Sequence, residues 1–128
     1  MKKLLIILAL VFTATGMTIA NQPAKKVKGI RHLVLVKFKE NTTPQQIARI
    51  DTLVMKMKNE IKAIHKLEWG KRMGLPGESD EYDYCLNIIF KSELNMTMYE
   101  EHPAHKKLKA AILPLISKIT RFNYEIEK

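Results

Sequence analysis

Two histidines and a tyrosine are the side chains of this sequence best suited to proton-transfer chemistry. Tyr99 comes shortly before a helix expected to start at Pro103, and His105 lies in the first turn of that helix. His32 lies in an apolar segment much earlier in the chain, so the fold must bring it to the other two. An imidazole exchanges a proton near neutral pH because its unperturbed pKa is about 6.5. Beside a phenol that stabilises a developing oxyanion, it could abstract a proton next to a carbonyl.

Each histidine also has a purely structural interpretation. His105 could be a core residue whose ring bonds a backbone carbonyl, and His32 could be a structural residue of a strand. His102 is expected to cap the helix that begins at Pro103. His102 and His105 have a spacing that a metal could use on a helix, but no third ligand is evident. We therefore predict no metal and no cofactor.

The elements that must position these side chains follow the order strand, helix, strand, strand, helix, strand. Residues 30–38 predict the first strand, because β-branched and aromatic side chains are frequent there. Alternation places His32, Val34 and Val36 on one face of that strand. Apolar residues at helical spacing over 44–64 predict a helix. We expect Thr43 to cap that helix, with a proline at its first position.

The second half of the chain predicts the remaining elements. Strands are expected at 66–72 and 82–90, followed by a short helical turn at 93–101. The second main helix is expected to continue from Pro103 through Ile116 and Ile119, with a kink or break at Pro114. Residues 121–126 then predict the last strand, and we expect the following side chains to face the core: Phe122, Tyr124 and Ile126.

This order predicts an α+β fold, the ferredoxin-like β-α-β-β-α-β protomer with a four-stranded antiparallel sheet and both helices on one face. We expect a ligand pocket between helices and sheet, with these walls: Val34, Trp69, Tyr84 and Leu108. The other sheet face would carry Leu33, Leu35, Cys85 and Ile89. A second copy could cover it, so we predict a homodimer that closes into an α/β barrel.

The N-terminal segment predicts export. Two lysines precede nine apolar residues, Leu4 to Phe12, and small residues follow up to Ala20. This is the pattern of a secretory signal peptide, so we expect residues 1–20 to be cleaved after Ala20 and the protein to be periplasmic or secreted. The apolar run is too short to span a bilayer, so no stable membrane insertion is expected after cleavage. Residues 21–28 are expected to form a flexible leader.

Composition limits the number of domains, the disulfides and the kinds of partner that can be expected. The chain has 128 residues, a formal net charge of +9 and 46% hydrophobic residues, which predicts one folded domain. Its lone cysteine, Cys85, has no internal disulfide partner. The basic residues are scattered and not interleaved with aromatic ones, so nucleic acid is not an expected partner.

Three motifs carry a family resemblance. They are IRHLVLVKFKENTT from Ile30, LEWG from Leu67, and MYEEHPAHKKL from Met98 followed by LPLISKI. With them the chain resembles the stress-responsive A/B barrel domain (Dabb) family, over Gly29 to Ile126. The resemblance implies a domain over 29–128 with a ferredoxin-like protomer and a homodimeric barrel.

The resemblance also implies roles for single residues. A polyketide-cyclase type of the family performs an intramolecular aldol condensation with a histidine and a tyrosine. Those residues match His105 as base and Tyr99 as its partner, and the histidine of the first strand matches His32. The chain departs from that type at two positions. The cyclase type has a histidine where this chain has Tyr84, and a tyrosine at about the position of Val54.

Three functions are therefore compatible with the sequence. The first is an exported barrel that binds a small, partly apolar ligand between helix and sheet. The second is a cyclase-like or lyase-like enzyme with His105 as general base and Tyr99 as its partner. The third is a structural or interaction protein that binds no ligand.

Overall fold

The computed structural model describes residues 28–127 and contains a single four-stranded sheet with its helices. The predicted signal peptide and all but the last residue of the predicted leader lie outside the described residues. The elements in chain order are β1 (Ile30–Phe38), α1 (Pro44–Glu60), β2 (Lys66–Lys71), β3 (Tyr84–Phe90), α2 (Glu93–Glu101), α3 (Pro103–Ile112), the 3-10 turn η1 (Leu113–Leu115) and β4 (Ile116–Glu125).

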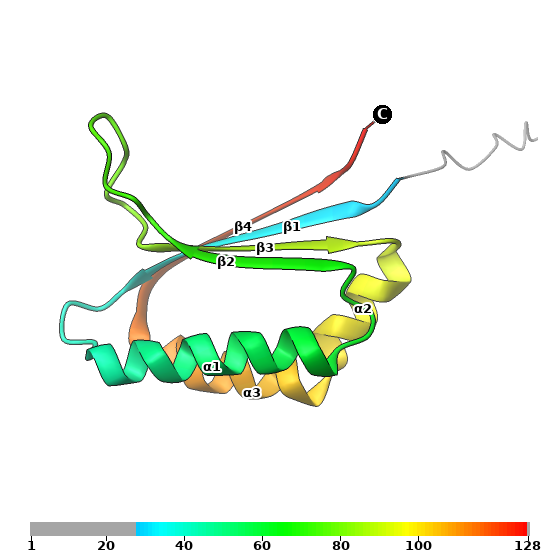
Figure 1. Cartoon of the computed structure of the whole chain (residues 1–128), viewed down its shortest axis with the longest axis horizontal. Coiled ribbons are helices and arrows are strands. Elements are labelled where there is room, and N and C mark those ends of the chain that lie inside the picture. Colours follow the sequence, from blue (N-terminus) through cyan, green and yellow to red (C-terminus); the bar gives the residue numbers. More distant parts are fainter. Residues whose placement is uncertain (1–27, 128) are drawn as a thin grey trace, which may run out of the picture.

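The sheet has the strand order β2-β3-β1-β4, and all its pairs are antiparallel. Figure 1 shows α1 and α3 side by side beneath one face of the sheet, and no described element covers the other face. This arrangement confirms the predicted ferredoxin-like fold. We call the uncovered side the open face; it carries Arg31, Leu33, Leu35 and Lys37 of β1.

Strand β1 shows why the two faces differ. Its residues alternate strictly between buried and partly exposed, with His32, Val34 and Val36 among the buried ones. Successive side chains of a strand point to opposite faces, so the buried set packs under the helices. The same alternation in β3 buries Leu86 and Ile88. Together they form the core with α1.

Helix α1 begins and packs as its sequence predicts. Thr43 accepts a hydrogen bond from the Gln46 backbone N–H, and the Gln46 side chain accepts one from the Thr43 backbone N–H. This capping box satisfies two of the N–H groups left free at a helix start. The buried face of α1 is formed by Ile50, Leu53, Val54 and Met57.

No helix in the 28–127 region is long and apolar enough to traverse a bilayer.

The last helix is shorter than predicted. Helix α3 ends at Ile112, and Pro114 lies in the 3-10 turn that follows it. Proline lacks the N–H that a continuing helix needs, so the chain leaves the helix there. Ile116 and Ile119, expected on the helix, belong instead to β4. The last strand therefore begins five residues before the predicted start at Arg121.

The face of β4 was also predicted wrongly. Phe122 lies opposite Leu33 in the antiparallel pair, and Tyr124 lies opposite Arg31. Residues directly opposite each other project to the same face, so both aromatic rings lie on the open face, where they are 62% and 41% exposed. Ile126 follows the end of β4 and is partly exposed. The pairing with β1, rather than the apolar character of the side chains, determines which face of the sheet each β4 side chain projects to.

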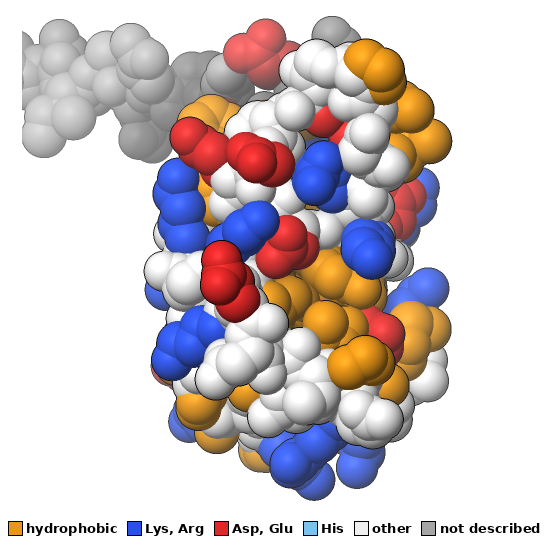
Figure 2. Space-filling view, turned by 90° about the vertical axis from the view of Figure 1, so that its left-hand side faces the viewer, with side chains coloured by type: hydrophobic (Ala, Val, Ile, Leu, Met, Phe, Trp, Pro, Cys, Tyr) orange, Lys and Arg blue, Asp and Glu red, His pale blue; other side chains and the backbone are white. Residues whose placement is uncertain are grey.

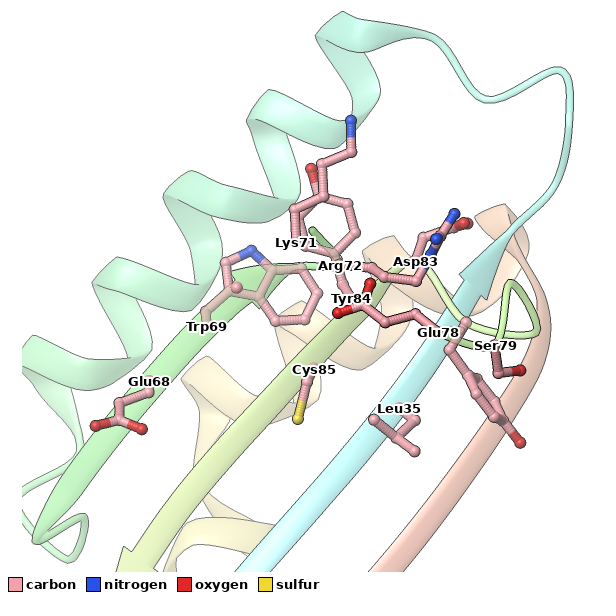
Figure 3. A pocket seen from close by; sticks show the side chains of 12 residues that line it. Leu35, Glu68, Trp69, Lys71, Arg72, Glu78, Ser79, Asp83, Tyr84 and Cys85 are labelled. Carbon is pink, nitrogen blue, oxygen red and sulfur yellow. The ribbon is translucent and has the colours of Figure 1, made fainter. Parts of the chain in front are cut away.

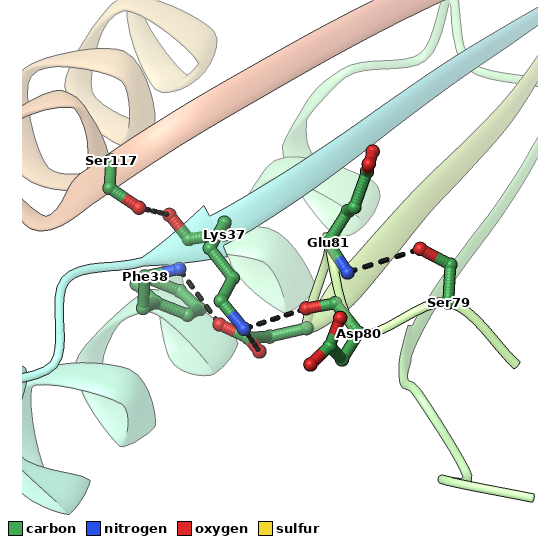
Figure 4. Close-up of polar contacts among 7 residues, drawn as sticks. Lys37, Phe38, Ser79, Asp80, Glu81 and Ser117 are labelled. Carbon is green, nitrogen blue, oxygen red and sulfur yellow. Dashed lines mark hydrogen bonds and ion pairs between the residues drawn. The ribbon is translucent and has the colours of Figure 1, made fainter.

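A loop of residues 72–83 joins β2 to β3 and projects beyond the sheet (Figure 1). Asp83 ties its end to β1, because one carboxylate oxygen accepts from the Phe38 backbone N–H at 2.9 Å and the other lies 3.1 Å from Lys37 Nζ. The same ammonium donates to the Asp80 carbonyl at 2.8 Å (Figure 4). The open face therefore has a polar, anchored border at this end.

Candidate functional site

A cavity of about 250 Å³ lies between the sheet and the helices. All four strands and all three α-helices contribute to it, and we call it the helix–sheet cavity. Its lining comprises His32, Val34, Val36, Val54, Trp69, Leu86, Tyr99, Glu100, His105, Leu108, Lys109, Ile112, Leu113, Ile119 and Arg121. The structure thus brings the three predicted chemical side chains, from β1, α2 and α3, to one place.

His32 is held by a neighbour on β4. Its ring is 5% exposed, and its Nδ1 lies 2.6 Å from Asn123 Oδ1. An amide oxygen only accepts hydrogen bonds, so His32 Nδ1 donates and carries the hydrogen. In the neutral ring, Nε2 is then the nitrogen with the free lone pair. The structural interpretation of His32 and a chemical role are both compatible with this geometry.

His105 is oriented in the same way by the backbone. Its Nδ1 lies 3.1 Å from the Glu100 carbonyl oxygen, which can only accept, so Nδ1–H donates and Nε2 is left free. Burial lowers the pKa of His105 below its ordinary 6.5, and the hydrogen bond to Glu100 opposes that shift. The ring is therefore mainly neutral at pH 7, which is the form that can accept a proton.

Tyr99 stacks directly on His105. Their ring centroids are 4.1 Å apart and the rings are inclined by 30°, while the His32 ring centroid lies 5.8 Å from that of Tyr99 in an edge-on arrangement. Burial raises the pKa of the Tyr99 phenol far above its ordinary range, and the Glu100 charge adds to this. Tyr99 therefore stays protonated and can act as a hydrogen-bond donor.

The predicted pocket walls are placed in two groups. Val34, Trp69 and Leu108 line the helix–sheet cavity. Tyr84 does not line it; its ring stacks on Trp69 with centroids 4.8 Å apart. The Trp69 indole N–H also donates to Asp51 Oδ1 at 2.7 Å. Trp69 is thus a fixed wall, and Tyr84 supports it.

His102 has the structural role predicted for it. Its Nδ1 accepts a hydrogen bond from the Ala104 backbone N–H at 3.1 Å, which caps α3 ahead of Pro103. In the region from residue 28 to residue 127, no three His, Cys, Asp or Glu side chains group together as metal ligands would.

Four polar residues of the site were missed by the sequence reasoning: Glu100, Lys109, Arg121 and Asn123. Arg121 and Asn123 lie opposite Val34 and His32 in the β1–β4 pair, and therefore on the helix side of the sheet. Phe122 and Tyr124 were predicted on that side, so Arg121 and Asn123 were expected to point outward. The alternation of β4 was visible in the sequence, but its direction depends on the register with β1.

A second hollow of about 520 Å³ lies at the border of the open face, beneath the 72–83 loop. Figure 3 shows Leu35 and Cys85 from the strands beside Glu78 and Ser79 from the loop. Burial raises the pKa of the Cys85 thiol, so it remains protonated at neutral pH. Figure 2 shows hydrophobic side chains at this end of the molecule with charged ones around them. We place the candidate site in the smaller cavity, where the imidazoles and the phenol are.

Solved structures share this architecture. A dimeric ferredoxin-like protein of unknown function from Thermobifida fusca superposes with a TM-score of 0.71 at 24% identity, over 83% of this chain and 97% of that one. Hydroxynitrile lyase from Passiflora edulis superposes with a TM-score of 0.72 at 21% identity, over 79% of this chain and 95% of that one. At these identities the likeness establishes the fold.

Named relatives match over most of the domain. The stress-response A/B barrel domain-containing protein HS1 of Arabidopsis thaliana is 24% identical over 79% of this chain and 94% of its own length. Olivetolic acid cyclase of Cannabis sativa is 25% identical over 77% of this chain and 98% of its own. The family model described as the stress responsive A/B barrel domain matches residues 30–126. With its ferredoxin-like sheet and helices, the chain therefore belongs to the stress-responsive A/B barrel domain family.

Proposed function

We propose that the protein binds a small, partly apolar molecule in the helix–sheet cavity. The observation that carries the proposal is the composition of its lining, in which aliphatic side chains surround two imidazoles and one phenol. Ligand sites are mostly apolar concave spaces with a few convergent polar groups. Val54, from α1, adds an aliphatic surface to this lining.

Thermal-shift measurements with a panel of small hydrophobic carbonyl compounds test this proposal. A ligand that binds the folded state raises the midpoint of unfolding with its concentration. Ile119→Trp should reduce the shift by filling the cavity beside its rim, whereas Leu94→Trp, at an exposed position outside the cavity, should not. If no compound stabilises the protein, and His105→Leu makes it more stable, the third function, a protein without a ligand, is favoured instead.

The orientation of His105 supports a second candidate function, proton abstraction as in a cyclase or lyase. Its Nδ1–H is engaged by the Glu100 carbonyl, which leaves Nε2 to take a proton from a carbon next to a carbonyl. The protonated Tyr99 would donate a hydrogen bond to the oxygen on which negative charge develops. Relatives named as a cyclase and as a lyase are compatible with this chemistry.

Proton abstraction can be measured before the overall reaction is known. Carbonyl compounds that bind should exchange their α-hydrogens with deuterium from heavy water, as followed by NMR. His105→Ala should lower the exchange rate at least ~100-fold, in the range of general-base catalysis. Tyr99→Phe should lower it without preventing binding. Exchange that continues unchanged in His105→Ala would show that this residue is not the base.

We also propose that two copies pair through their open faces to form a barrel. Apolar side chains are left in part accessible there, among them Leu33, Leu35 and Phe122. Several structural neighbours are described as dimeric. Arg31 and Asn87 also lie on the open face, where the Arg31 guanidinium donates to Asn87 Oδ1 at 2.9 Å within one protomer. Light scattering of the full chain at micromolar concentration should give twice the protomer mass.

Export remains a proposal that rests on the N-terminal pattern. Leu4 to Phe12 is a short apolar run after two lysines, and Ala20 offers a cleavage site. Intact-mass measurement on protein from the native source should give a chain that begins at Asn21. A membrane-bound chain that retains residues 1–20 would contradict it.

A further inference from the structure

The lining of the helix–sheet cavity carries an excess of positive charge that the proton-transfer chemistry does not use. Arg121 of β4 and Lys109 of α3 both line the cavity, and Glu100 of α2 is the acidic residue of the same lining. All three side chains belong to exposed residues, so they lie where the cavity meets solvent. Within the described part of the chain, the Arg121 and Lys109 side chains form no ion pair or hydrogen bond.

The two positive charges reach the groups inside the cavity. The Arg121 charge acts on the Tyr99 phenol by favouring its ionised form, against the larger effect of burial on that pKa. The Lys109 charge lowers the pKa of His105, since it disfavours a second positive charge nearby. A group bound beside Tyr99 and His105 is therefore within electrostatic reach of both cations.

The interior of the cavity has the opposite character. Its walls include Val36, Val54, Leu86, Leu108 and Ile112, four of which are buried core residues. A bound molecule therefore meets aliphatic surface inside and two cations where the cavity opens. This polarity along one cavity suits a molecule that is apolar at one end and anionic at the other.

We propose that the ligand is an amphipathic carboxylate, with its apolar body among the aliphatic walls and its carboxylate held by Arg121 and Lys109. The proposal rests on the proposed ligand-binding function and specifies its ligand class. A guanidinium offers parallel N–H donors that match a carboxylate, and hydrogen bonds between ionised partners are stronger than neutral ones. The Glu100 carboxylate repels a bound anion, but its single negative charge is outnumbered by the positive charges of Arg121 and Lys109.

A matched pair of ligands tests the charge requirement. We would titrate 4-phenylbutyrate and its neutral amide, 4-phenylbutyramide, into the full chain at pH 7.5 by calorimetry. The acid should bind about 10-fold more tightly, in keeping with hydrogen bonds to a charged group. Arg121→Gln should remove most of that preference, because it should weaken binding of the acid much more than binding of the amide. Glu100→Gln should strengthen acid binding a few-fold and leave the amide unchanged.

Lys106→Gln is the matched control, because Lys106 lies on α3 and lines no described cavity. It makes the same change in net charge as Arg121→Gln, so acid binding should not change. Equal binding of acid and amide would overturn the ligand class and leave ligand binding itself intact. Equal weakening by Arg121→Gln and Lys106→Gln would overturn the role of Arg121. If neither ligand binds, and no compound of the thermal-shift panel does, the proposed binding function fails as well.

Discussion

The two faces of strand β1 have different surroundings although their residues alternate along nine positions of the same strand. On the helix side, His32, Val34 and Val36 are buried and line a cavity. On the open face, Leu33 and Leu35 stay partly exposed, with no described element over them. Within one protomer, the helices therefore cover one face of β1, and the other face stays uncovered.

The candidate site and the proposed dimer interface therefore lie on opposite faces of the sheet. The groups that could act on a ligand come from β1, β4, α2 and α3 of one chain, so a monomer can contain the whole candidate site. The open face carries apolar side chains such as Leu33 and Leu35 together with polar pairs such as Arg31 with Asn87. A change on one face should therefore affect binding, and a change on the other should affect dimerisation.

The largest expected effect is on assembly. Leu35→Asp would place an unpaired charge among the apolar side chains of the proposed seam, which is costly to desolvate. We expect light scattering to show a monomer or an aggregate. Met55→Asp is the control, because Met55 lies on α1, is 49% exposed and is away from the open face. A Leu35→Asp variant that remains a stable dimer would contradict the barrel arrangement.

Two adjacent isoleucines of β3 allow the two faces of the sheet to be compared by their contributions to stability. Ile88 is fully buried on the helix side, while Ile89 is partly exposed on the open face. Ile88→Ala should lower the free energy of unfolding by about 2–5 kcal/mol, since it opens a cavity in the core. Ile89→Ala should cost less at low protein concentration, where the proposed dimer dissociates. Urea unfolding at several concentrations measures both, and equal losses would break the distinction between the faces.

The hydrogen bond between His32 and Asn123 should have a moderate effect. Asn123→Ala leaves the Nδ1–H of a buried ring without its acceptor, and we expect a loss of about 1 kcal/mol. A double-mutant cycle with His32→Phe should assign most of that loss to the pair, because His32→Phe removes the unpaired donor. No coupling between the two substitutions would show that the contact contributes nothing to stability.

The smallest expected effect is the pH dependence that His105 contributes. Its pKa is lowered in the folded state, so the unfolded chain binds more protons as pH falls below about 6.5. Stability should therefore fall as pH decreases from that value through the folded pKa, and stay constant above it. Unfolding at pH 7.5 and 5.5 should show a smaller difference in His105→Gln than in the wild type. An unchanged difference would mean that other groups cause the acid sensitivity.

Much of the fold and part of the site could be predicted from local patterns. The alternation of β1, the capping signal at Thr43 and the cap at His102 depend on neighbours in sequence, and the structure confirms them. The convergence of His32, Tyr99 and His105 was also predicted, and the structure places all three in the lining of one cavity. These inferences succeed because a period of two or 3.6 residues shows which side is buried.

The family, the order of elements and the buried faces of β1, β3 and α1 could all be derived from sequence patterns. The start of β4 and the direction of its side chains instead depend on how β4 pairs with β1, because a register shift of one residue exchanges the two faces of a strand. That register places Asn123 against His32 and Arg121 in the cavity, with Phe122 on the open face. The free nitrogen of each ring likewise depends on an acceptor, Asn123 Oδ1 or the Glu100 carbonyl, that only folding brings to it.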